Sequence, residues 1–475
     1  MKRLLILAFL GALCQPLFAA RPNFVIVFID DLGWGDFSCF GNQEAQTPNI
    51  DRIAAEGIRY EQFYVNAPIC SPSRCALLTG QYPQRWRITS FLNNRADNER
   101  RGCAQWLDPK APSLAAMLKS HGYATGHFGK WHLGGQRDVE DAPPISAYGF
   151  DESLTNFEGM GAKLLPLTMK PGDAQPGRIW EDAERLGGPV VWMQRSEITG
   201  GFVGAALAFM KRAAASQRPF LVNLWPDDVH GPWWPPVTQW TEGKRGKYLA
   251  VLEAMDRQLG RLFDYLREVP ELRDNTLLLL CSDNGPEAGA GSAGPLKGGK
   301  TMLYEGGTRS PLIVWAPGLL EKSAMGKVDR ASVFAAFDLA PSLLSIAGLK
   351  AEGVAFDGED VSPALLGRAE VSRGAPIFWR RPPDRKTAGA GQPERLPDLA
   401  MREGEWKLLC EYDGSQPQLY HLKNDPGESR NLAAVEEART RQMTAALLAW
   451  HGTMPPDRGE ELGRLPAAGK KAGGR

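Results

Sequence analysis

Four short apolar runs, each followed by polar or turn-forming residues, constrain the fold of this chain more than any other feature. The runs are apolar at consecutive positions, which is typical of strands buried on both faces. They occupy residues 24–29, 220–225, 277–281 and 311–316. Between them lies helical periodicity, clearest in the stripe Tyr248, Leu252, Met255, Leu259, Leu262 and Leu266. This alternation predicts an α/β fold with a central, mostly parallel sheet flanked by helices.

Polar side chains follow the first three runs directly. They are Asp30 and Asp31 after the first run, Asp227, Asp228 and His230 after the second, and Asp283 and Asn284 after the third. Ligands of parallel sheets gather beyond the carboxyl ends of the strands. We therefore expect these residues to share one cleft.

The acidic residues among them indicate a metal site. Two adjacent carboxylates, such as Asp30 and Asp31, repel each other unless a cation lies between them. A turn or cap is the alternative for that pair alone. Asp283 and Asn284 repeat the arrangement after another strand. Together the four offer only oxygen donors, which favours calcium or magnesium over zinc.

A second candidate site is the segment CSPSRCALLTG at residues 70–80. Pro72 suits the first turn of a helix, where its missing N–H costs nothing. A helix that begins here would bring positive potential to Cys70, and Arg74 would add a full charge. The residue types alone are compatible with a thiolate nucleophile and go no further.

CSPSR followed by LLTG resembles the signature of the type I sulfatases, in which a maturation enzyme reads Cys-x-Pro-x-Arg and oxidises the cysteine to formylglycine. Other segments resemble the same family, in the same order, over roughly residues 22–450. They are FVIVFIDDLGWGD, TPNIDRIAAEG, GYATGHFGKWHLG, SDNG, GGKTMLYEGGTRSPLIVWAPG and LYHLKNDPGESRNLA. The chain is similar to arylsulfatases and N-acetylgalactosamine-6-sulfatases, within the alkaline-phosphatase-like superfamily.

This resemblance implies an alkaline-phosphatase-like fold with a smaller C-terminal antiparallel-sheet subdomain. It implies one Ca²⁺ per chain, or Mg²⁺ in its place. The implied metal ligands are Asp30, Asp31, Asp283, Asn284 and the formylglycine made from Cys70. The implied catalytic set is Cys70, Arg74, Lys130, His132, His230 and Lys300. Arg74 would hold the formylglycine, and Lys130 and Lys300 would hold the sulfate.

The family resemblance also implies the chemistry, hydrolysis of a sulfuric ester. The formylglycine aldehyde hydrates, so that one carbon carries two hydroxyls. One hydroxyl attacks sulfur, while His230, helped by Lys300, protonates the departing alcohol. His132 then deprotonates the second hydroxyl, which restores the aldehyde and expels sulfate. A sulfated carbohydrate is the expected substrate.

Candidate substrate-binding residues lie near these motifs. They are Arg85 and Arg87 after the signature, Arg137 and Asp138 after GKWHLGG, and Asp227, Asp228, Trp233 and Trp234 around His230. Carboxylates suit sugar hydroxyls, and tryptophans suit sugar faces. A structural role is the alternative for each. A further sulfate contact is open between Ser153, Thr155 and Asn156.

The first residues predict export. Lys2 and Arg3 precede an apolar run at residues 4–13, and Ala19 and Ala20 follow, an order typical of a secretory signal peptide. The run is too short to span a bilayer. A lipid anchor at Cys14 is the alternative, but the preceding Leu13 is large for that cleavage site. We predict a signal peptide at 1–20, a periplasmic or secreted location, and no membrane span.

The domain organisation follows from the segment 380–397, which is rich in proline, glycine and charge and predicts a linker or loop. Strand-like runs at 406–412 and 418–422 and a helical pattern at 433–450 come after it. We predict a catalytic domain at 21–370, a small C-terminal subdomain at 371–455 and a disordered tail at 456–475.

Charge and cysteine content limit the partners. Lysine plus arginine equals aspartate plus glutamate, 55 each, so no long-range attraction to nucleic acid is expected. The expected partners are the sulfated substrate and the formylglycine-generating enzyme; the oligomeric state is open. One disulfide is possible among the six cysteines after residue 20. Two alternatives stay open: a phosphate or phosphonate ester hydrolase of the same fold, and a non-catalytic glycan binder with unmodified Cys70.

Overall fold

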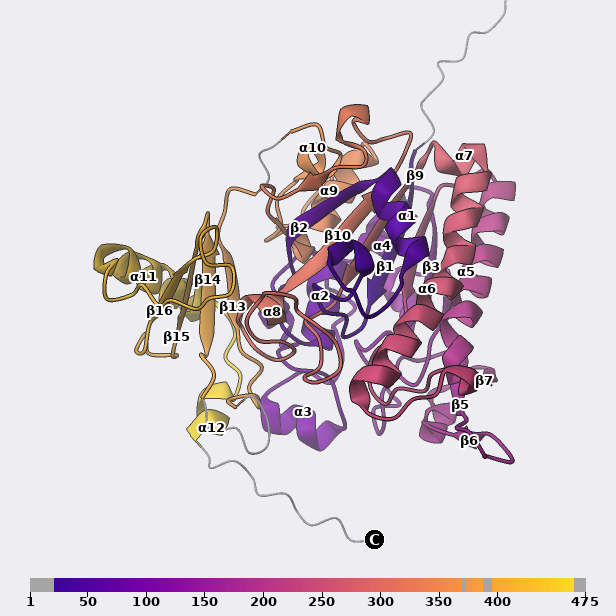
Figure 1. Cartoon of the computed structure of the whole chain (residues 1–475), viewed down its shortest axis with the longest axis horizontal. Helices are drawn as coiled ribbons and strands as arrows, with labels where there is room; N and C mark the ends of the chain where they lie inside the picture. The colour runs from indigo at the N-terminus through magenta and orange to yellow at the C-terminus, as the bar shows by residue number, and fades with distance from the viewer. Residues whose placement is uncertain (1–20, 370–372, 388–394, 465–475) are drawn as a thin grey trace, which may run out of the picture.

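The computed structural model describes residues 21–369, 373–387 and 395–464. A large mixed sheet lies at its centre, with helices on both faces, and a small sheet with one long helix stands to one side (Figure 1). The predicted signal peptide, with Cys14, lies outside the described residues. Within them, no helix is long and apolar enough to cross a bilayer.

The central sheet has nine strands. In spatial order eight of them are β11 (Val328–Asp329), β2 (Ile58–Tyr64), β10 (Arg309–Trp315), β9 (Thr276–Ser282), β1 (Asn23–Ile29), β8 (Phe220–Trp225), β3 (Ala124–Gly129) and β4 (Glu152–Leu154). The ninth, β12 (Phe334–Ala335), pairs with β2. All neighbours are parallel except β10, which runs antiparallel to both β9 and β2. The predicted mostly parallel sheet is confirmed, and β2 and β3 are strands that the apolar runs did not reveal.

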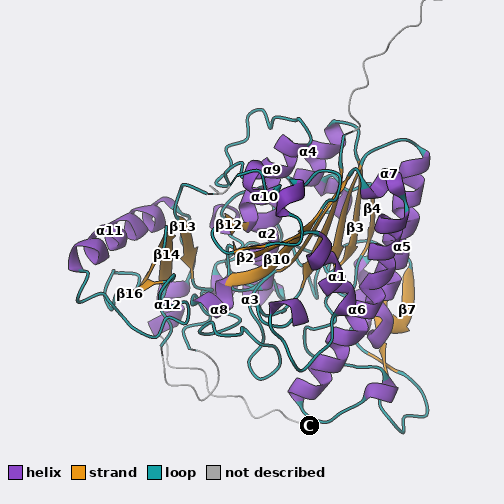
Figure 2. Ribbon diagram, turned by 45° about the horizontal axis from the view of Figure 1, so that its top comes forward, coloured by secondary structure: helices purple, strands orange, loops and turns teal. Residues whose placement is uncertain are grey.

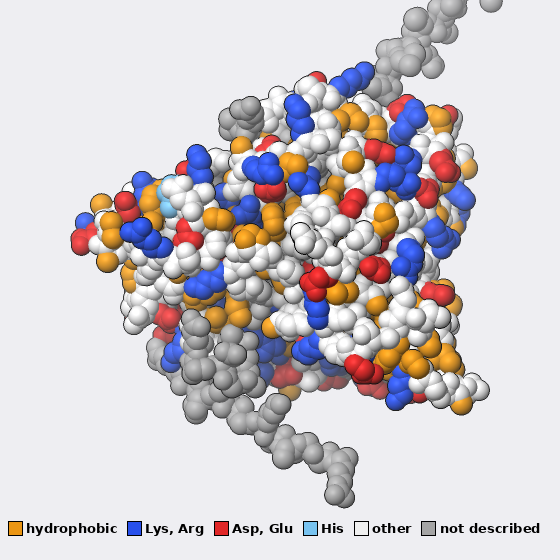
Figure 3. Space-filling view, viewed as in Figure 1, with side chains coloured by type: hydrophobic (Ala, Val, Ile, Leu, Met, Phe, Trp, Pro, Cys, Tyr) orange, Lys and Arg blue, Asp and Glu red, His pale blue; other side chains and the backbone are white. Residues whose placement is uncertain are grey.

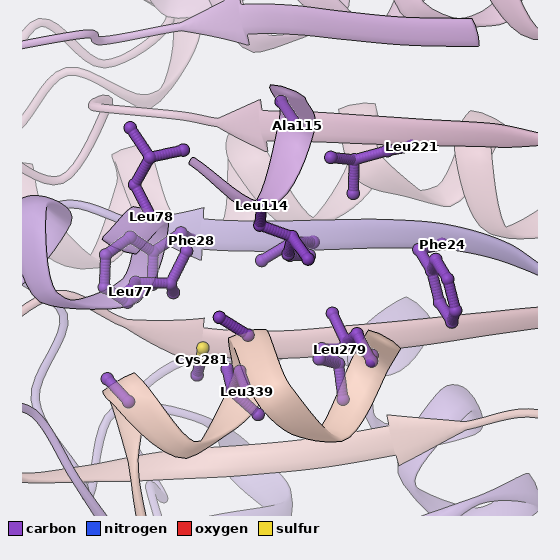
Figure 4. Packing of buried hydrophobic residues seen from close by; sticks show 14 of the residues in the cluster. Phe24, Phe28, Leu77, Leu78, Leu114, Ala115, Leu221, Leu279, Cys281 and Leu339 are labelled. Atoms are coloured by element: carbon purple, nitrogen blue, oxygen red, sulfur yellow. The ribbon is translucent and has the colours of Figure 1, made fainter. Parts of the chain in front are cut away.

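Alternate residues of β1 face two separate cores. Phe24 and Phe28 pack with helices on one face (Figure 4), and Val25 and Val27 pack with helices on the other. Figure 2 shows helices on both sides of the sheet. The first layer comprises α2 (Cys70–Thr79), α4 (Leu114–Ser120), α9 (Leu339–Ile346) and α10 (Ser362–Leu365). The second comprises α1 (Pro48–Glu56), α5 (Ile198–Ala215), α6 (Lys244–Glu268) and α7 (Pro270–Arg273). Consecutive apolar residues in the strands thus reflect burial on both faces.

The C-terminal part forms an antiparallel sheet of its own. Its strands are β13 (Ile377–Arg380), β14 (Leu399–Glu403), β15 (Trp406–Cys410) and β16 (Gln418–His421), and α11 (Glu437–Thr453) packs on them. This is the predicted small antiparallel sheet. The boundary at residue 370 stays a prediction.

Two smaller features were not predicted. A three-stranded sheet joins β5 (Lys163–Thr168), β6 (Gly177–Arg178) and β7 (Val190–Gln194). Helix α12 (Gly459–Arg464) lies in the segment predicted to be a disordered tail, so that prediction is wrong for these residues. The segment is anchored because buried Asp457 pairs with Arg380 at 3.2 Å. Residues 465–475 lie outside the described residues.

Two further helices are α3 (Arg95–Arg101) and α8 (Glu305–Thr308), and α8 directly precedes β10. All six cysteines of the described chain are free, so the disulfide that the sequence allowed is not formed there. Basic and acidic side chains are interspersed on the face in Figure 3.

Candidate active site

Four parallel strands deliver the polar residues of the site to one edge of the central sheet. Strands β9, β1, β8 and β3 are consecutive neighbours and run in the same direction. The predicted residues 30–31, 283–284, 227–230 and 130–132 each follow the carboxyl end of one of these strands. The N-terminus of α2 brings Cys70 to the same place, because its thiol lies close to Asp30 and Asp283.

The predicted metal ligands form one buried cluster. The ligand atoms of Asp30, Cys70 and Asp283 all lie within 4.8 Å of one another. The Asp31 N–H donates to Asp283 Oδ1 at 3.1 Å, and Asn284 Nδ2 donates to Asp31 Oδ1 at 2.7 Å. The structure therefore brings together all five residues that the sequence singled out.

Three cations face the three carboxylates. Lys130 Nζ lies 2.6 Å from Asp30 Oδ2, and Lys300 Nζ lies 2.5 Å from Asp31 Oδ2. Arg74 Nη2 lies 2.7 Å from Asp283 Oδ2 and 3.3 Å from Asp30 Oδ1. Burial raises the pKa of Asp30, but Lys130, His230 and Arg74 outweigh it and hold that pKa well below its usual value.

The donor set fits a hard divalent cation. Two buried oxygens, Asp30 Oδ1 and Asn284 Oδ1, accept no hydrogen bond from any described residue. Burial, and then the charge of Asp30, raise the pKa of Asp283 well above its usual value. Carboxylate and amide oxygens with unused lone pairs are the ligands that Ca²⁺ and Mg²⁺ prefer.

Cys70 is not activated as a thiol. It is buried, and burial raises its pKa to about 12, although Lys130 and Lys300 act in the opposite direction. Asp30 and Asp283 add to the rise. The thiolate nucleophile that the sequence left open is therefore disfavoured, because carboxylates and low polarity surround the sulfur.

The two predicted histidines differ in exposure and in tautomer. His230 Nδ1 donates to the Gly231 carbonyl at 2.6 Å, and its Nε2 lies 3.6 Å from Asp31 Oδ2. Its side chain is 25% exposed, whereas that of His132 is 4% exposed. His132 Nε2 donates to the Leu92 carbonyl at 3.0 Å. Burial lowers the pKa of both, and nearby lysines add to the effect.

Asp227 and Asp228 are held by the protein itself. Asp227 pairs with Arg195 at 2.7 Å and accepts from Asn156 Nδ2 at 2.7 Å. Asp228 accepts a hydrogen bond from Thr199 Oγ1, and burial raises its pKa to about 6. Both are buried and have partners within the protein, which supports the structural role that was the alternative for each; substrate binding by them stays a prediction.

The arginines after the signature have hydrogen-bond partners of their own. Arg85 forms two hydrogen bonds to Asp357, at 2.7 and 2.6 Å, beyond the far end of α2. Helix α2, which begins at Cys70, is ten residues or about 15 Å long and ends at Thr79, before Arg85. Arg87 is exposed and donates to the Gly102 carbonyl at 3.3 Å. These contacts account for both side chains by a structural role, which was the alternative for each, and substrate binding by them stays a prediction.

Other substrate candidates are spread around the site. The ring of Trp233 lies beside Gly231, next to His230, and its indole N–H donates to the Val229 carbonyl at 2.7 Å. Arg137 Nη1 lies 3.9 Å from Glu158. The remaining candidates have local partners: Asp138 accepts from the Arg95 N–H, Trp234 packs on Trp240, and Thr155 Oγ1 accepts from Lys163.

The structure adds three residues that the sequence did not single out. Glu158 lies 3.1 Å from His132. The Phe157 ring centroid is 5.9 Å from Lys130 Nζ and 4.1 Å from the ring centroid of Trp180. Neither periodicity nor a motif marks residues 157–158 in the sequence, so only the loop's path over β3 reveals them.

An acidic cluster, three cations and a buried cysteine at the carboxyl edge of this sheet are the site of a hydrolase of anionic esters with the alkaline-phosphatase-like fold. The sequence model of the Sulfatase family matches residues 22–349. The chain belongs to this family and is a sulfuric ester hydrolase.

Named relatives agree with this assignment. The chain is 29% identical to human arylsulfatase A over 484 residues, covering 92% of this chain and 88% of that protein. It is 33% identical to N-acetylgalactosamine-6-sulfatase of Sus scrofa over 388 residues, covering 78% and 70%. Among solved structures it is similar to Ps i-CgsB in complex with k-i-k-neocarrahexaose, with a TM-score of 0.74 and 27% identity. That match covers 90% of this chain and 92% of the other.

Proposed function

We propose that this sulfatase removes sulfate from a sulfated carbohydrate, with formylglycine made from Cys70 as its nucleophile and one Ca²⁺ as its metal. The observation that carries the proposal is the clustering of Asp30, Cys70 and Asp283 within 4.8 Å, with Lys130 and Lys300 against the same group of carboxylates. The carbohydrate class is supported by the relatives, which include an N-acetylgalactosamine-6-sulfatase and a neocarrahexaose complex.

Asp30, Asp31, Asp283 and Asn284, with the modified residue 70, would hold the cation. When bound, Ca²⁺ supplies positive charge that offsets the clustered carboxylates and the sulfate oxygens. Mg²⁺ has the same donor preference and is the alternative metal. Arg74 and Lys130 hold the carboxylates of Asp283 and Asp30 in position through ion pairs within the protein.

Formylglycine at position 70 supplies two hydroxyls on one carbon once hydrated, which avoids the charged thiolate that burial disfavours. Arg74 fixes the surroundings of residue 70 through Asp283 and the Lys130 carbonyl, to which it donates at 3.1 Å. Lys130 and Lys300 present ammonium groups at the cluster, where they stabilise negative oxygens of a bound sulfate as charge develops.

The two histidines have different proton tasks. His230 is partly exposed at the cluster, which places it, in its protonated form, to give a proton to the departing sugar oxygen, so that the sugar leaves as an alcohol. His132 is buried with its Nδ1 unpartnered among the described residues, which leaves that nitrogen free to take a proton near residue 70. The partly exposed His230 suits a leaving group that departs to solvent, and the buried His132 suits a proton transfer inside the site.

Aromatic residues around the cluster suit a sugar. Trp233 lies beside His230, and Phe157 with Trp180 lies beside Lys130. Tryptophan and phenylalanine faces pack against the apolar faces of sugar rings. We propose these residues, in place of Arg85, Arg87, Asp227 and Asp228, as the walls that contact the carbohydrate.

The proposal extends to organisation and location. The signal peptide at 1–20 would direct the chain to the periplasm or outside the cell, where sulfated glycans are met. We propose a catalytic domain that ends near residue 370, followed by the C-terminal subdomain. Maturation would require a formylglycine-generating enzyme that reads the Cys70–Arg74 motif.

Mass spectrometry of the peptide that contains residue 70, combined with assays on sulfated monosaccharides, tests the proposal. We expect the aldehyde in place of the thiol, and hydrolysis that Cys70→Ala abolishes. Unmodified cysteine in the native host, with tight glycan binding and no turnover, would favour the non-catalytic alternative. Faster turnover of phosphate or phosphonate esters than of any sulfate ester would favour the other alternative.

A further inference from the structure

A buried carboxylate, Glu158, lies beside His132 and takes no part in the mechanism above. Its Oε2 is 3.1 Å from His132 Nε2, and its side chain is 2% exposed. Arg137 has its Nη1 at 3.9 Å from Glu158 Oε1, beyond hydrogen-bond distance. Glu158 Oε2 accepts no hydrogen bond from the described residues. Because such burial is costly for a carboxylate, the position indicates a function.

The protein fixes the loop that carries Glu158. The Gly159 N–H donates to the Gly135 carbonyl at 2.7 Å, which ties the loop to the segment after His132. Lys163 Nζ, buried, donates to Thr155 Oγ1 at 3.1 Å and to the Gly159 carbonyl. Gly159 has φ +103°, and a Cβ there would lie 3.0 Å from Trp131 Cβ. The loop is therefore pressed against the backbone of residues 131–135.

The hydrogen bonds of His132 identify its tautomer. The Leu92 carbonyl can only accept, so Nε2 carries the hydrogen and Nδ1 has the free lone pair. Nδ1 is buried and has no hydrogen-bond partner among the described residues. Leu92 also donates its N–H to Ser71 Oγ at 3.0 Å, which links His132 to the residue next to position 70. The His132 backbone has φ +56°, a strained conformation typical of functional residues.

We propose that Glu158 is a positioning residue whose carboxylate stabilises the imidazolium that His132 becomes when its Nδ1 takes a proton during turnover. The inference rests on the proposed function. The proton leaves a hydroxyl of residue 70, whose oxygen becomes the aldehyde oxygen. The bond from that carbon to the sulfate oxygen breaks, and sulfate leaves with the electron pair. Solvent later takes the proton from His132. A carboxylate beside the other ring nitrogen has the same task in Ser-His-Asp enzymes.

The charge of Glu158 changes near neutral pH, within the range over which activity can be assayed. Burial raises its pKa to about 7, although Lys130, Arg137 and Arg74 lower it and Asp30 raises it further. His132 is the titratable group in direct contact with it. Glu158 is therefore a carboxylate above pH 7 and neutral below it. Its contribution to turnover should follow the same titration.

The first test compares kcat and KM of wild type and Glu158→Gln on a sulfated sugar between about pH 5 and 9. Above pH 8 we expect kcat to fall about 100-fold with KM unchanged, a typical value for one proton-transfer contribution. Below about pH 6 the kcat values of wild type and variant should converge, because residue 158 is then neutral in both proteins. Glu158→Asp should recover part of the rate at high pH.

A matched control is Glu152→Gln, which neutralises an exposed glutamate of β4 that pairs with Arg212. Its kcat should equal that of wild type at every pH. A purely structural role for Glu158 would give a rate ratio that does not change with pH, and this outcome would overturn the proposal. Full activity of Glu158→Gln would also overturn it.

A second readout does not need the modified residue. In the Cys70→Ala background, melting temperatures with and without the Glu158→Gln substitution are compared over the same pH range. The pKa of Glu158 is raised from about 4.5 to about 7 in the folded protein, so the protein with Glu158 loses stability as pH rises through this range. The melting temperature of the Glu158→Gln variant should therefore rise relative to that of the protein with Glu158 over the same range. A constant difference would contradict the assignment. If residue 70 is unmodified and wild type is inactive, the proposed function fails, while this measurement still reports on Glu158.

Discussion

The guanidinium of Arg74 binds the carboxylate of Asp283 at 2.7 Å, and both side chains are fully buried. Arg74 comes from the first turns of α2 and Asp283 from the end of β9, 209 residues later. The same guanidinium lies 5.2 Å from the ring of Trp225 and 5.7 Å from that of Phe28. Arg74 thus joins the helix that carries Cys70 to the strand ends that carry the acidic cluster.

Replacing Arg74 by alanine should destabilise the fold. Asp283 and Asp30 would lose a buried partner, and breaking a buried pair from one side costs about 3–5 kcal/mol. Urea unfolding monitored by circular dichroism measures the change. Arg441→Ala removes an exposed pair with Glu437 and should cost less than about 1 kcal/mol. Equal costs for the two variants would contradict the structural role of Arg74.

Removal of the divalent cation should lower both stability and activity. Without it, Asp30, Asp31 and Asp283 depend on Lys130, Lys300 and Arg74 alone for neutralisation. At 100-fold excess over its dissociation constant, a bound ion adds about 2.7 kcal/mol to stability. Thermal melts with chelator, and then with restored Ca²⁺ or Mg²⁺, measure this. A melting temperature indifferent to chelator would argue against a metal at this cluster.

Asp283→Asn is the matched variant for the metal experiment. It keeps the shape of the side chain, loses one anionic ligand, and should weaken the response of the melting temperature to Ca²⁺. Asp274→Asn, an exposed aspartate at the opposite end of β9, should leave that response unchanged. If both variants respond like wild type, Asp283 is not a ligand.

The sequence predicts the strand ends well because runs of five or six predominantly apolar residues, too short for a typical helix and bounded by turn-forming residues, are typical of strands buried on both faces. Residues 24–29, 220–225 and 277–281 became β1, β8 and β9, and the polar residues after them share one edge. Strand β3 was not predicted from periodicity, because Gly126, His127 and Gly129 interrupt its apolar character. Only the family motif pointed to Lys130 and His132.

The substrate candidates stay predictions, since closeness in sequence to a motif does not fix the direction of a side chain. Arg85 follows the signature, but α2 ends at Thr79 before it, and its guanidinium donates to Asp357. Asp227 and Asp228 follow β8, but Asp227 forms an ion pair with Arg195 and Asp228 accepts a hydrogen bond from Thr199. Glu158 could not be found at all, because its contact with His132 depends on how a glycine-containing loop crosses the end of β3.

His230→Gln should affect substrates according to their leaving groups. A sugar hydroxyl is a poor leaving group and needs a proton, so we expect kcat/KM to fall about 100-fold or more on sugar sulfates. On 4-nitrophenyl sulfate, whose phenolate leaves readily, the loss should be much smaller. Paired assays on the two substrates measure this. Equal losses on both would show that His230 has a different task.

The last prediction concerns a buried lysine shared by two glutamates. Lys407 of β15 lies 2.9 Å from Glu305 and 3.3 Å from Glu428. Burial raises the pKa of Glu305, but Lys407 and Arg309 outweigh it and lower that pKa to about 2. Burial raises the pKa of Glu428 to about 7, against the effect of Lys407. The two carboxyls should therefore contribute to stability with opposite dependence on pH.

Glu305→Gln should be less stable than wild type by about 3 kcal/mol at neutral pH, and the difference should shrink as pH falls from about 4.5 towards 2. The lowered pKa means that stability is present above the unfolded value and lost below it. Glu428→Gln should show the reverse: equal to wild type near pH 4, and more stable as pH rises through about 7. Urea midpoints of both variants across this range measure the trends. Parallel trends in the two variants would contradict the assignment of opposite pH dependence, because one shared lysine would then be neutralising both carboxyls alike.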